Sequence, residues 1–180
     1  IIPIFIEEKA FKIHSNIICV SEFCKDITQK SFNLKNEPRV VYNGVRVNEL
    51  FDDELNYQIN NKSIYYFGSL RERKGLIVAC NVINKAIIKH PDLTFHLIGK
   101  NEENNWKNIC LQILSPQALK NTFYHGSLHQ PKAFEILKNA HIVLFPSFGE
   151  NFSMALLEVM ALGRITITSS IPSFREVIID

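Results

Sequence analysis

Short runs of β-branched and aromatic residues alternate along the chain with longer segments in which apolar residues recur at helical spacing. The short runs have the length and composition of strands, and the segments between them are long enough to form helices. We expect strands at residues 17–20, 39–42, 63–67, 94–98, 122–125, 141–145 and 165–168. We expect helices at residues 22–32, 75–89, 105–114, 131–139 and 153–162, and a last helix that begins at Pro172.

A strand that returns after almost every helix is typical of βαβ units and a parallel sheet. Residues 141–145 are almost continuously apolar, as expected for a strand covered on both faces. The predicted fold class is therefore α/β, a Rossmann-like parallel sheet with helices on both faces. Ligands of such sheets bind at the carboxyl ends of the strands. Gly68, Gly99, Gly126 and the turn at residues 147–150 all fall at such ends.

Composition limits the class of protein. The 180 residues suffice for one well-cored domain, and 46% hydrophobic with 21% charged residues is ordinary for a soluble globular protein. The net charge is only +2, so binding to nucleic acid would require a local basic cluster. Arg71, Arg73 and Lys74 form the one dense cluster, which is too short for a polybasic arm. We expect no nucleic-acid partner.

Cysteine and histidine spacing argues against a metal site. The cysteines at positions 19, 24, 80 and 110 form no C-x-x-C pair, and the six histidines lack H-x3-H or H-E-x-x-H spacing. We interpret the cysteines as reduced thiols of a cytosolic protein. The chain has no membrane-length apolar run and no leader-like start, so we expect neither secretion nor membrane spanning. Its first residue is not Met, which suggests that a longer protein has been cut.

Two glutamates flank the start of the helix expected at residues 153–162. Ser153 is a suitable N-cap and Gly163 a natural C′ residue, so Glu150 lies in the turn ahead of the helix and Glu158 two turns inside it. Backbone N–H groups at Ser153 and Met154 would create an anion site beside a carboxylate that accepts hydrogen bonds from hydroxyls. Alternatively, Glu150 only complements the helix dipole and Glu158 is solvated. The spacing alone does not decide between them.

Further motifs stand in a fixed order around this pair. The strand expected at residues 141–145 is followed by Pro146-Ser147, Glu150-Asn151-Phe152 and Leu157-Glu158-Val159-Met160-Ala161-Leu162-Gly163. Upstream come Val20-Ser21-Glu22, Tyr42-Asn43-Gly44-Val45, Gly68-Ser69-Leu70, Lys74-Gly75 and His125-Gly126-Ser127-Leu128. With these motifs, residues 17–180 resemble the retaining glycosyltransferases of family 4, also called glycosyl transferases group 1, whose Glu-x7-Glu pattern is met by Glu150 and Glu158.

The resemblance implies a GT-B enzyme made of two Rossmann-like halves. Residues 1–47 would then be the tail of an N-terminal acceptor-binding domain, 48–60 a connector, and 61–180 a nucleotide-sugar donor-binding domain that is incomplete at its C-terminus. The implied reaction moves a hexosyl group, with retention, from a nucleotide diphosphate sugar to an alcohol of a glycan or lipid-linked glycan, in cytoplasmic polysaccharide biosynthesis. Peripheral association of the full-length protein with the membrane is compatible with this reading. This chain alone is expected to bind nucleotide diphosphates without catalysing transfer.

The resemblance also assigns roles to residues. The implied donor-binding set is Gly68, Ser69, Lys74, Gly126, Glu150, Asn151, Phe152, Ser153, Met154 and Glu158, with Glu150 and Lys74 as catalytic residues. Glu150 would bind hydroxyls of the transferred sugar, and Glu158 would accept hydrogen bonds from the ribose diol. Asn151 and Ser153 replace glycines of the family's Glu-Gly-Phe-Gly, which narrows the pocket but keeps the backbone donors.

The loop at residues 68–75 follows a strand and opens a helix, so its backbone and Lys74 can reach a diphosphate. The family has an Arg where this chain has Ser69, and neither Arg71 nor Arg73 falls on that position. A basic solvated turn is the alternative. At Gly126, the resemblance implies close approach of the nucleotide base, and a glycine required only for positive φ is the alternative.

No metal or other cofactor is implied, because no Asp-x-Asp occurs and positive groups would stand in for a metal. Two other classes of protein remain open. A nucleotide-sugar epimerase would share the fold but would need an acid/base pair that the sequence does not display, and a non-catalytic module would only bind the nucleotide. A dinucleotide-dependent oxidoreductase is disfavoured because no G-x-G-x-x-G follows a strand.

Overall fold

The computed structural model describes residues 9–11, 13–14, 16–32, 34–46, 59–101 and 105–178. They fall into two compact units. The first unit comprises Ile1–Gly44, Glu150–Ser153 and Ser170–Asp180, and the second comprises Val45–Gly149 and Met154–Ser169. Apart from its last two residues, the connector expected at residues 48–60 lies outside the described residues. The division into acceptor and donor domains stays a prediction.

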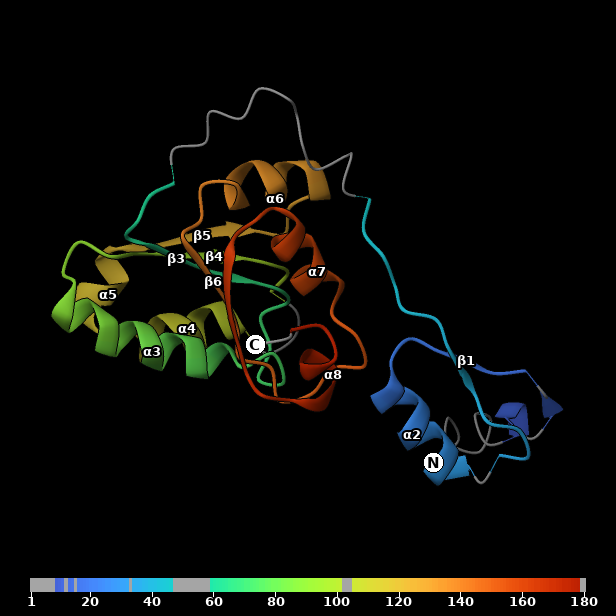
Figure 1. Ribbon diagram of the computed structural model, residues 1–180. Helices are drawn as coiled ribbons and strands as arrows, with labels where there is room; N and C mark the ends of the chain where they lie inside the picture. Colours follow the sequence, from blue (N-terminus) through green and yellow to red (C-terminus); the bar gives the residue numbers. More distant parts are fainter. Residues whose placement is uncertain are drawn as a thin grey trace. The chain divides into compact units, whose positions relative to one another are not determined.

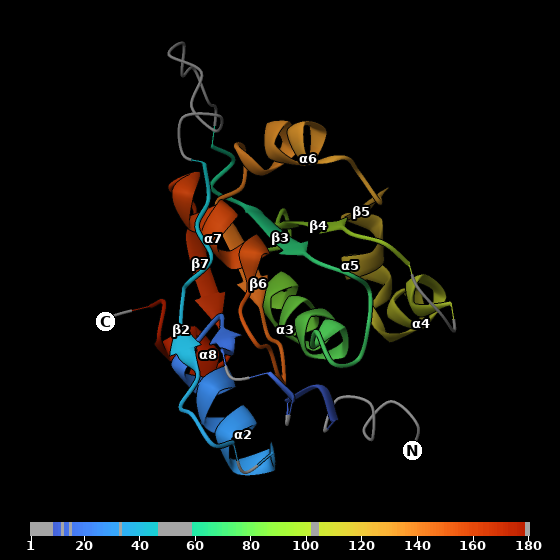
Figure 2. The same ribbon diagram turned by 90° about the vertical axis from the view of Figure 1, so that its right-hand side faces the viewer.

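The second unit is built on a five-stranded parallel sheet, as the alternating pattern predicted. Its strands are β3 (Ser63–Phe67), β4 (Thr94–Ile98), β5 (Thr122–Gly126), β6 (Ile142–Phe145) and β7 (Ile165–Thr168). Their order is β5-β4-β3-β6-β7, and every neighbouring pair is parallel. Figure 2 shows β4 and β5 on one side of β3, with β6 and β7 on the other.

Helices cover both faces of this sheet. Figure 1 shows α3 (Leu76–Lys89), α4 (Trp106–Ile113) and α5 (Pro116–Lys120) on one face, and α6 (Gln130–Leu137) and α7 (Met154–Ala161) on the other. The predicted Rossmann-like α/β class is confirmed. The sequence pattern missed α5, whose five residues are too few for apolar periodicity. Its start is readable, because Ser115 caps the helix through the Ala118 N–H at 3.2 Å and Pro116 stands at N1.

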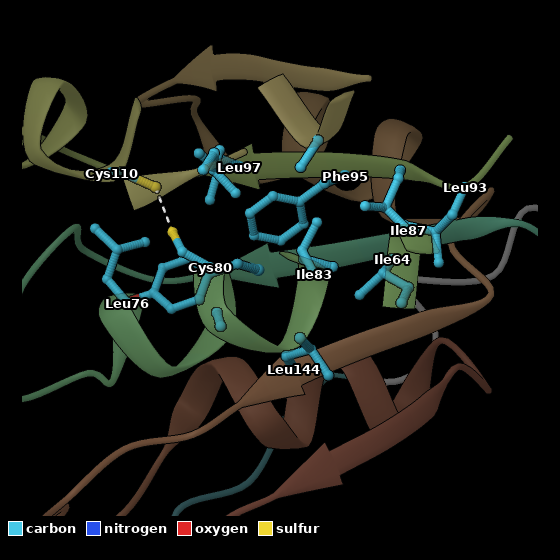
Figure 3. Packing of buried hydrophobic residues seen from close by; sticks show 14 of the residues in the cluster. Ile64, Leu76, Cys80, Ile83, Ile87, Leu93, Phe95, Leu97, Cys110 and Leu144 are labelled. Carbon is cyan, nitrogen blue, oxygen red and sulfur yellow. Dashed lines mark hydrogen bonds between the residues drawn. The ribbon is translucent and has the colours of Figure 1, made fainter. Parts of the chain in front are cut away.

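The main core lies between α3 and the sheet (Figure 3). Side chains that are nearly excluded from solvent line both sides of this layer, including Tyr66, Leu76, Ile83, Phe95 and Leu97. The Cys80 and Cys110 Sγ atoms lie 2.7 Å apart within it, between α3 and α4. Both cysteines are free, and the contact with Cys110 together with burial raises the pKa of the Cys80 thiol.

The described residues of the first unit include a two-stranded parallel sheet and helices. The strands are β1 (Ile18–Cys19) and β2 (Arg39–Val40), which are shorter than the expected runs. Helix α2 (Glu22–Phe32) has the predicted bounds, and α8 (Pro172–Arg175) begins at Pro172 as expected and contacts α2. Within the described ranges, no helix of either unit combines the length and the apolar character needed to cross a bilayer.

Candidate functional site

The second unit has a topological switch point at the carboxyl edge of its sheet. From the central strand β3 the chain continues to β4 and β5 on one side and then returns to β6 on the other side of β3. Open α/β sheets bind ligands at such a point, outside the carboxyl ends of the strands. Gly68, Gly99, Gly126 and Ser147 follow or end four of these strands, so the structure brings all four to this edge, as the sequence predicted.

Glycines let the loops at this edge pack closely. The Gly68 N–H donates to the Ile98 carbonyl at 3.0 Å, and the Gly99 N–H donates to the Gly126 carbonyl at 2.9 Å. A Cβ on Gly99 would lie 1.7 Å from the Gly68 carbonyl oxygen, so only glycine fits there. A Cβ on Gly68 or Gly126 would meet no described atom within 4 Å. Both glycines therefore face open space, and Gly126 also has a φ of 76°.

The loop after β3 is tied to the loop after β6 across the switch point. The Arg73 carbonyl accepts a hydrogen bond from the Phe148 N–H at 2.9 Å, and the Arg73 guanidinium donates to the Gly149 carbonyl. Gly75 has a φ of 71°, and a Cβ there would lie 1.9 Å from the Pro146 carbonyl oxygen. Lys74, which is half-buried, stands between these two fixed residues. Its backbone position is thus determined on both sides.

Arg71 and Ser69 occupy the remaining positions of interest in this loop. The hydroxyl of the buried Tyr66 donates to the Ser69 carbonyl at 2.9 Å, which fixes the turn just after β3. Arg71 is half-buried and Arg73 exposed. The Arg73 guanidinium donates to the Gly149 carbonyl, so it is directed at the loop after β6.

Helix α7 carries Glu158 and ends as its sequence predicted. Gly163 has a φ of 66°, its N–H donates to the Met160 carbonyl, and the Arg164 N–H donates to the Val159 carbonyl. These are the two hydrogen bonds of a Schellman motif.

The Glu158 side chain is half-buried and bound to Gln130 of α6. The Gln130 Nε2 donates to Glu158 Oε1 at 2.6 Å. Burial raises the pKa of the Glu158 carboxyl, and the bond from Gln130 opposes this in part. Glu158 therefore has a side-chain partner on α6.

The Glu150–Ser153 segment belongs to the first unit, although the residues on either side of it belong to the second. Glu150 and Ser153 are buried, with 8% and 6% of their surfaces exposed. The Ser21 hydroxyl donates to the Asn151 carbonyl at 2.7 Å. The Phe152 ring lies 5.9 Å from the Tyr42 ring, centroid to centroid. This segment is therefore packed against residues more than a hundred positions earlier in the chain.

A histidine pair lies on the α6/α7 face of the sheet. His96 Nδ1 and His125 Nε2 are 3.0 Å apart, and the His96 ring stacks on Tyr65 at 4.3 Å between centroids. Burial, followed by the neighbouring His125, lowers the pKa of His96 to about 4, and burial also lowers the pKa of His125. Both rings are therefore neutral at pH 7. In the described part of the chain, no three His, Cys, Asp or Glu residues are grouped to hold a metal ion.

Three contacts of the expected site residues were not predicted from the sequence, although Ser21 and Tyr42 stand in the motifs quoted above. Ser21 precedes α2 and is readable as an N-cap, but its partner Asn151 is 130 residues away. Tyr42 and Gln130 carried no recognisable signal toward Phe152 and Glu158, because those contacts arise only from tertiary packing.

Comparison with known proteins gives one consistent result. A family model described as Glycosyl transferases group 1 matches residues 61–180. An uncharacterized glycosyltransferase of Methanocaldococcus jannaschii is 27% identical over 169 residues, which cover 91% of this chain and 42% of that relative. The chain thus spans less than half the length of this relative.

Two solved structures illustrate the likeness in fold. A glycosyltransferase from Rickettsia africae superposes with a TM-score of 0.81 at 17% identity, over 96% of this chain and 50% of that one. The Anabaena protein HepE, in complex with UDP and glucose, gives a TM-score of 0.77 at 18% identity, over 92% of this chain and 47% of that one. At this level of identity, both matches bear on the fold alone.

Proposed function

The chain belongs to the glycosyl transferases group 1 family, and from this premise we propose that it is the donor-binding part of a retaining hexosyltransferase. The donor is a nucleotide diphosphate sugar, and the acceptor is an alcohol of a glycan or lipid-linked glycan. The observation that carries the proposal is the switch point of the second unit. There, Lys74 is fixed beside a carboxyl edge that leaves open space over Gly68 and Gly126.

The proposed diphosphate site combines a cation with a helix start. Lys74 supplies a point charge, and the backbone N–H groups at Met154 and Ala155 lie at the start of α7, where helix geometry provides no acceptor within the helix. Such groups stabilise charge that develops on a departing diphosphate, and their fixed positions mean that little reorganisation is needed during reaction. The hydrogen bond from the Arg73 guanidinium to the Gly149 carbonyl fixes the loop in which Lys74 lies.

The proposed ribose site is the carboxylate of Glu158. Its Oε1 accepts the Gln130 hydrogen bond, so Oε2 and the remaining lone pairs are available to hydroxyls of a vicinal diol. The nucleotide base would lie over Gly126, where a side chain is absent. Glu150, with the backbone of Asn151, Phe152, Ser153 and Met154, would bind the transferred sugar and orient its anomeric carbon.

A donor screen tests this proposal. UDP-sugars are the first choice because HepE is in complex with UDP and glucose, and GDP- and ADP-sugars serve as competitors. A ligand that binds only the folded state raises the melting temperature with its concentration. We expect one nucleotide to stabilise the protein, and the shift to decrease in Lys74→Ala but not in Lys85→Ala, which removes an exposed lysine of α3.

Transfer is then measured with the full-length protein and the selected donor. Transfer of the hexosyl group to an acceptor with retained anomeric configuration is the expected result. Isomerisation of the donor sugar without acceptor would instead indicate an epimerase. Nucleotide binding without transfer to any acceptor would indicate a non-catalytic module, and no stabilisation by any nucleotide sugar would refute the proposed donor site.

A further inference from the structure

The start of α2 is the place where the Glu150–Ser153 segment is held. Ser21, directly before α2, is completely buried. Its hydroxyl accepts a hydrogen bond from the Cys24 N–H at 3.0 Å and donates one to the Asn151 carbonyl at 2.7 Å. A serine hydroxyl has a single proton to donate. Because the helix cap fixes the side chain as an acceptor, that proton is committed to Asn151.

A second contact reaches the same segment through Tyr42. The Tyr42 and Phe152 rings lie 5.9 Å apart at an interplanar angle of 42°, a tilted arrangement favourable for aromatic pairs. The Tyr42 hydroxyl donates to Glu176 Oε2 at 3.3 Å. The Tyr42 ring therefore has Phe152 beside it and Glu176 bound to its hydroxyl.

Glu176 joins the two contacts to one helix end. Its carboxylate accepts hydrogen bonds from the Glu22 and Phe23 N–H groups, both at 2.8 Å. A carboxylate at the N-terminus of a helix satisfies backbone donors that have no partner within the helix, and it is favoured by the helix dipole. Ser21 and Glu176 together accept hydrogen bonds from the first backbone N–H groups of α2. Tyr42 is hydrogen-bonded to Glu176.

We infer that Ser21 and Tyr42, both fixed at the start of α2, are positioning residues that hold the Glu150–Ser153 segment and so set the orientation of Glu150. The holding of the segment rests on the contacts alone, whereas its effect on sugar transfer rests on the proposed function. A serine that served only as an N-cap would not need its proton directed at Asn151, 130 residues away.

Hydrogen exchange of the full-length protein, followed by mass spectrometry of peptides that span Glu150–Ser153, tests the holding of the segment without a ligand. In Ser21→Ala we expect exchange there to be about tenfold faster, which corresponds to ~1.4 kcal/mol. Ser21→Thr retains the hydroxyl and should restore slow exchange. Ser31→Ala removes an exposed hydroxyl on the same helix and should leave this segment unchanged.

A second variant separates the contact from helix capping. Tyr42→Leu removes the ring contact with Phe152 and leaves the Ser21 cap and the Glu176 bonds to α2 in place. We expect faster exchange at Glu150–Ser153 with unchanged exchange in α2. If the amide hydrogens of Glu150–Ser153 exchange at the parent rate in both Ser21→Ala and Tyr42→Leu, the inference is wrong.

Kinetics of the same variants tests the consequence for transfer. With UDP-glucose, or the donor selected by the screen, we expect kcat to fall about tenfold while the affinity for the bare nucleotide diphosphate is unchanged, since that affinity is assigned to the second unit. Equal loss of both, or faster exchange with unchanged kcat, would refute the positioning of Glu150. If the parent protein transfers no sugar, the proposed function fails, and the exchange result still decides whether the segment is held.

Discussion

Gln130 Nε2 donates a 2.6 Å hydrogen bond to Oε1 of Glu158, which joins the first residue of α6 to the middle of α7. The bond fixes one carboxylate oxygen and leaves the other lone pairs for a ligand. Burial nevertheless raises the pKa of this carboxyl, so the charged form is less favourable here than in water. An ionised Glu158 at neutral pH therefore lowers the free energy of unfolding. Such a cost is expected where a charged group binds a ligand.

Glu158→Gln should therefore stabilise the protein at neutral pH while weakening nucleotide binding. Because the pKa of Glu158 is raised on folding, its contribution to stability is present below the pKa of the unfolded chain and is lost as pH rises through the pKa of the folded state. The gain from the amide should be larger at pH 7.5 than at pH 4. Urea unfolding at both pH values measures it, with the exposed Glu135→Gln as control. A variant less stable than the parent at pH 7.5 would contradict this prediction.

Lys74 should contribute more to diphosphate binding than either arginine of the same loop. Removal of a charge-assisted contact is expected to cost ~1.5–3 kcal/mol in nucleotide affinity. Arg73 is directed at the Gly149 carbonyl, so Arg73→Ala should act mainly through the loop and cost less. Calorimetry with UDP, or the nucleotide chosen by the screen, compares Lys74→Ala, Arg71→Ala and Arg73→Ala with Lys85→Ala. Parent-like binding by Lys74→Ala, with loss in Arg71→Ala or Arg73→Ala, would reassign the diphosphate contact.

The stability of the protein should fall on mild acidification because of His96. Its pKa of about 4 lies below the ordinary value near 6.5, so between these pH values the unfolded chain binds a proton that the folded chain excludes. The free energy of unfolding should decrease as pH falls through this window, by at most roughly 3 kcal/mol because solvent screens part of the effect at this half-buried ring. The lowered pKa of His125 acts in the same direction.

His96→Gln removes this titration and tests its origin. The difference in unfolding free energy between parent and variant should diminish as pH falls from 7 toward 4, and His14→Gln, which replaces an exposed histidine, serves as the control. Parallel pH profiles for the parent and His96→Gln would show that the acid sensitivity arises elsewhere.

Local patterns determined most of this fold. The bounds of β3, β4, β7 and α2 coincide with those expected, and β3 and β4 are each followed directly by a glycine. The short helix α5 was missed because five residues show no periodicity. Among the candidate site residues, Glu150, Glu158 and Lys74 stand in local motifs. Gln130, the partner of Glu158, does not, because their pairing depends on the packing of α6 beside α7, which no local spacing encodes.

The two glutamates should have separable kinetic roles, because they occupy different places relative to α7. Glu150 lies in the segment ahead of the helix and is assigned to the transferred sugar, whereas Glu158 lies inside the helix and is assigned to the ribose. In the full-length protein, Glu150→Gln should lower kcat with little change in affinity for the bare nucleotide diphosphate. Glu158→Gln should weaken binding of the bare nucleotide as much as binding of the sugar nucleotide, since both contain the ribose.

Loss of an interaction made mainly in the transition state lowers kcat, and loss of uniform binding raises KM. Steady-state kinetics and calorimetry of both variants test these two roles. Equal loss of bare-nucleotide binding in both variants would contradict the division of roles. Parent-like behaviour of both variants would leave Glu150 as a residue that only complements the helix dipole.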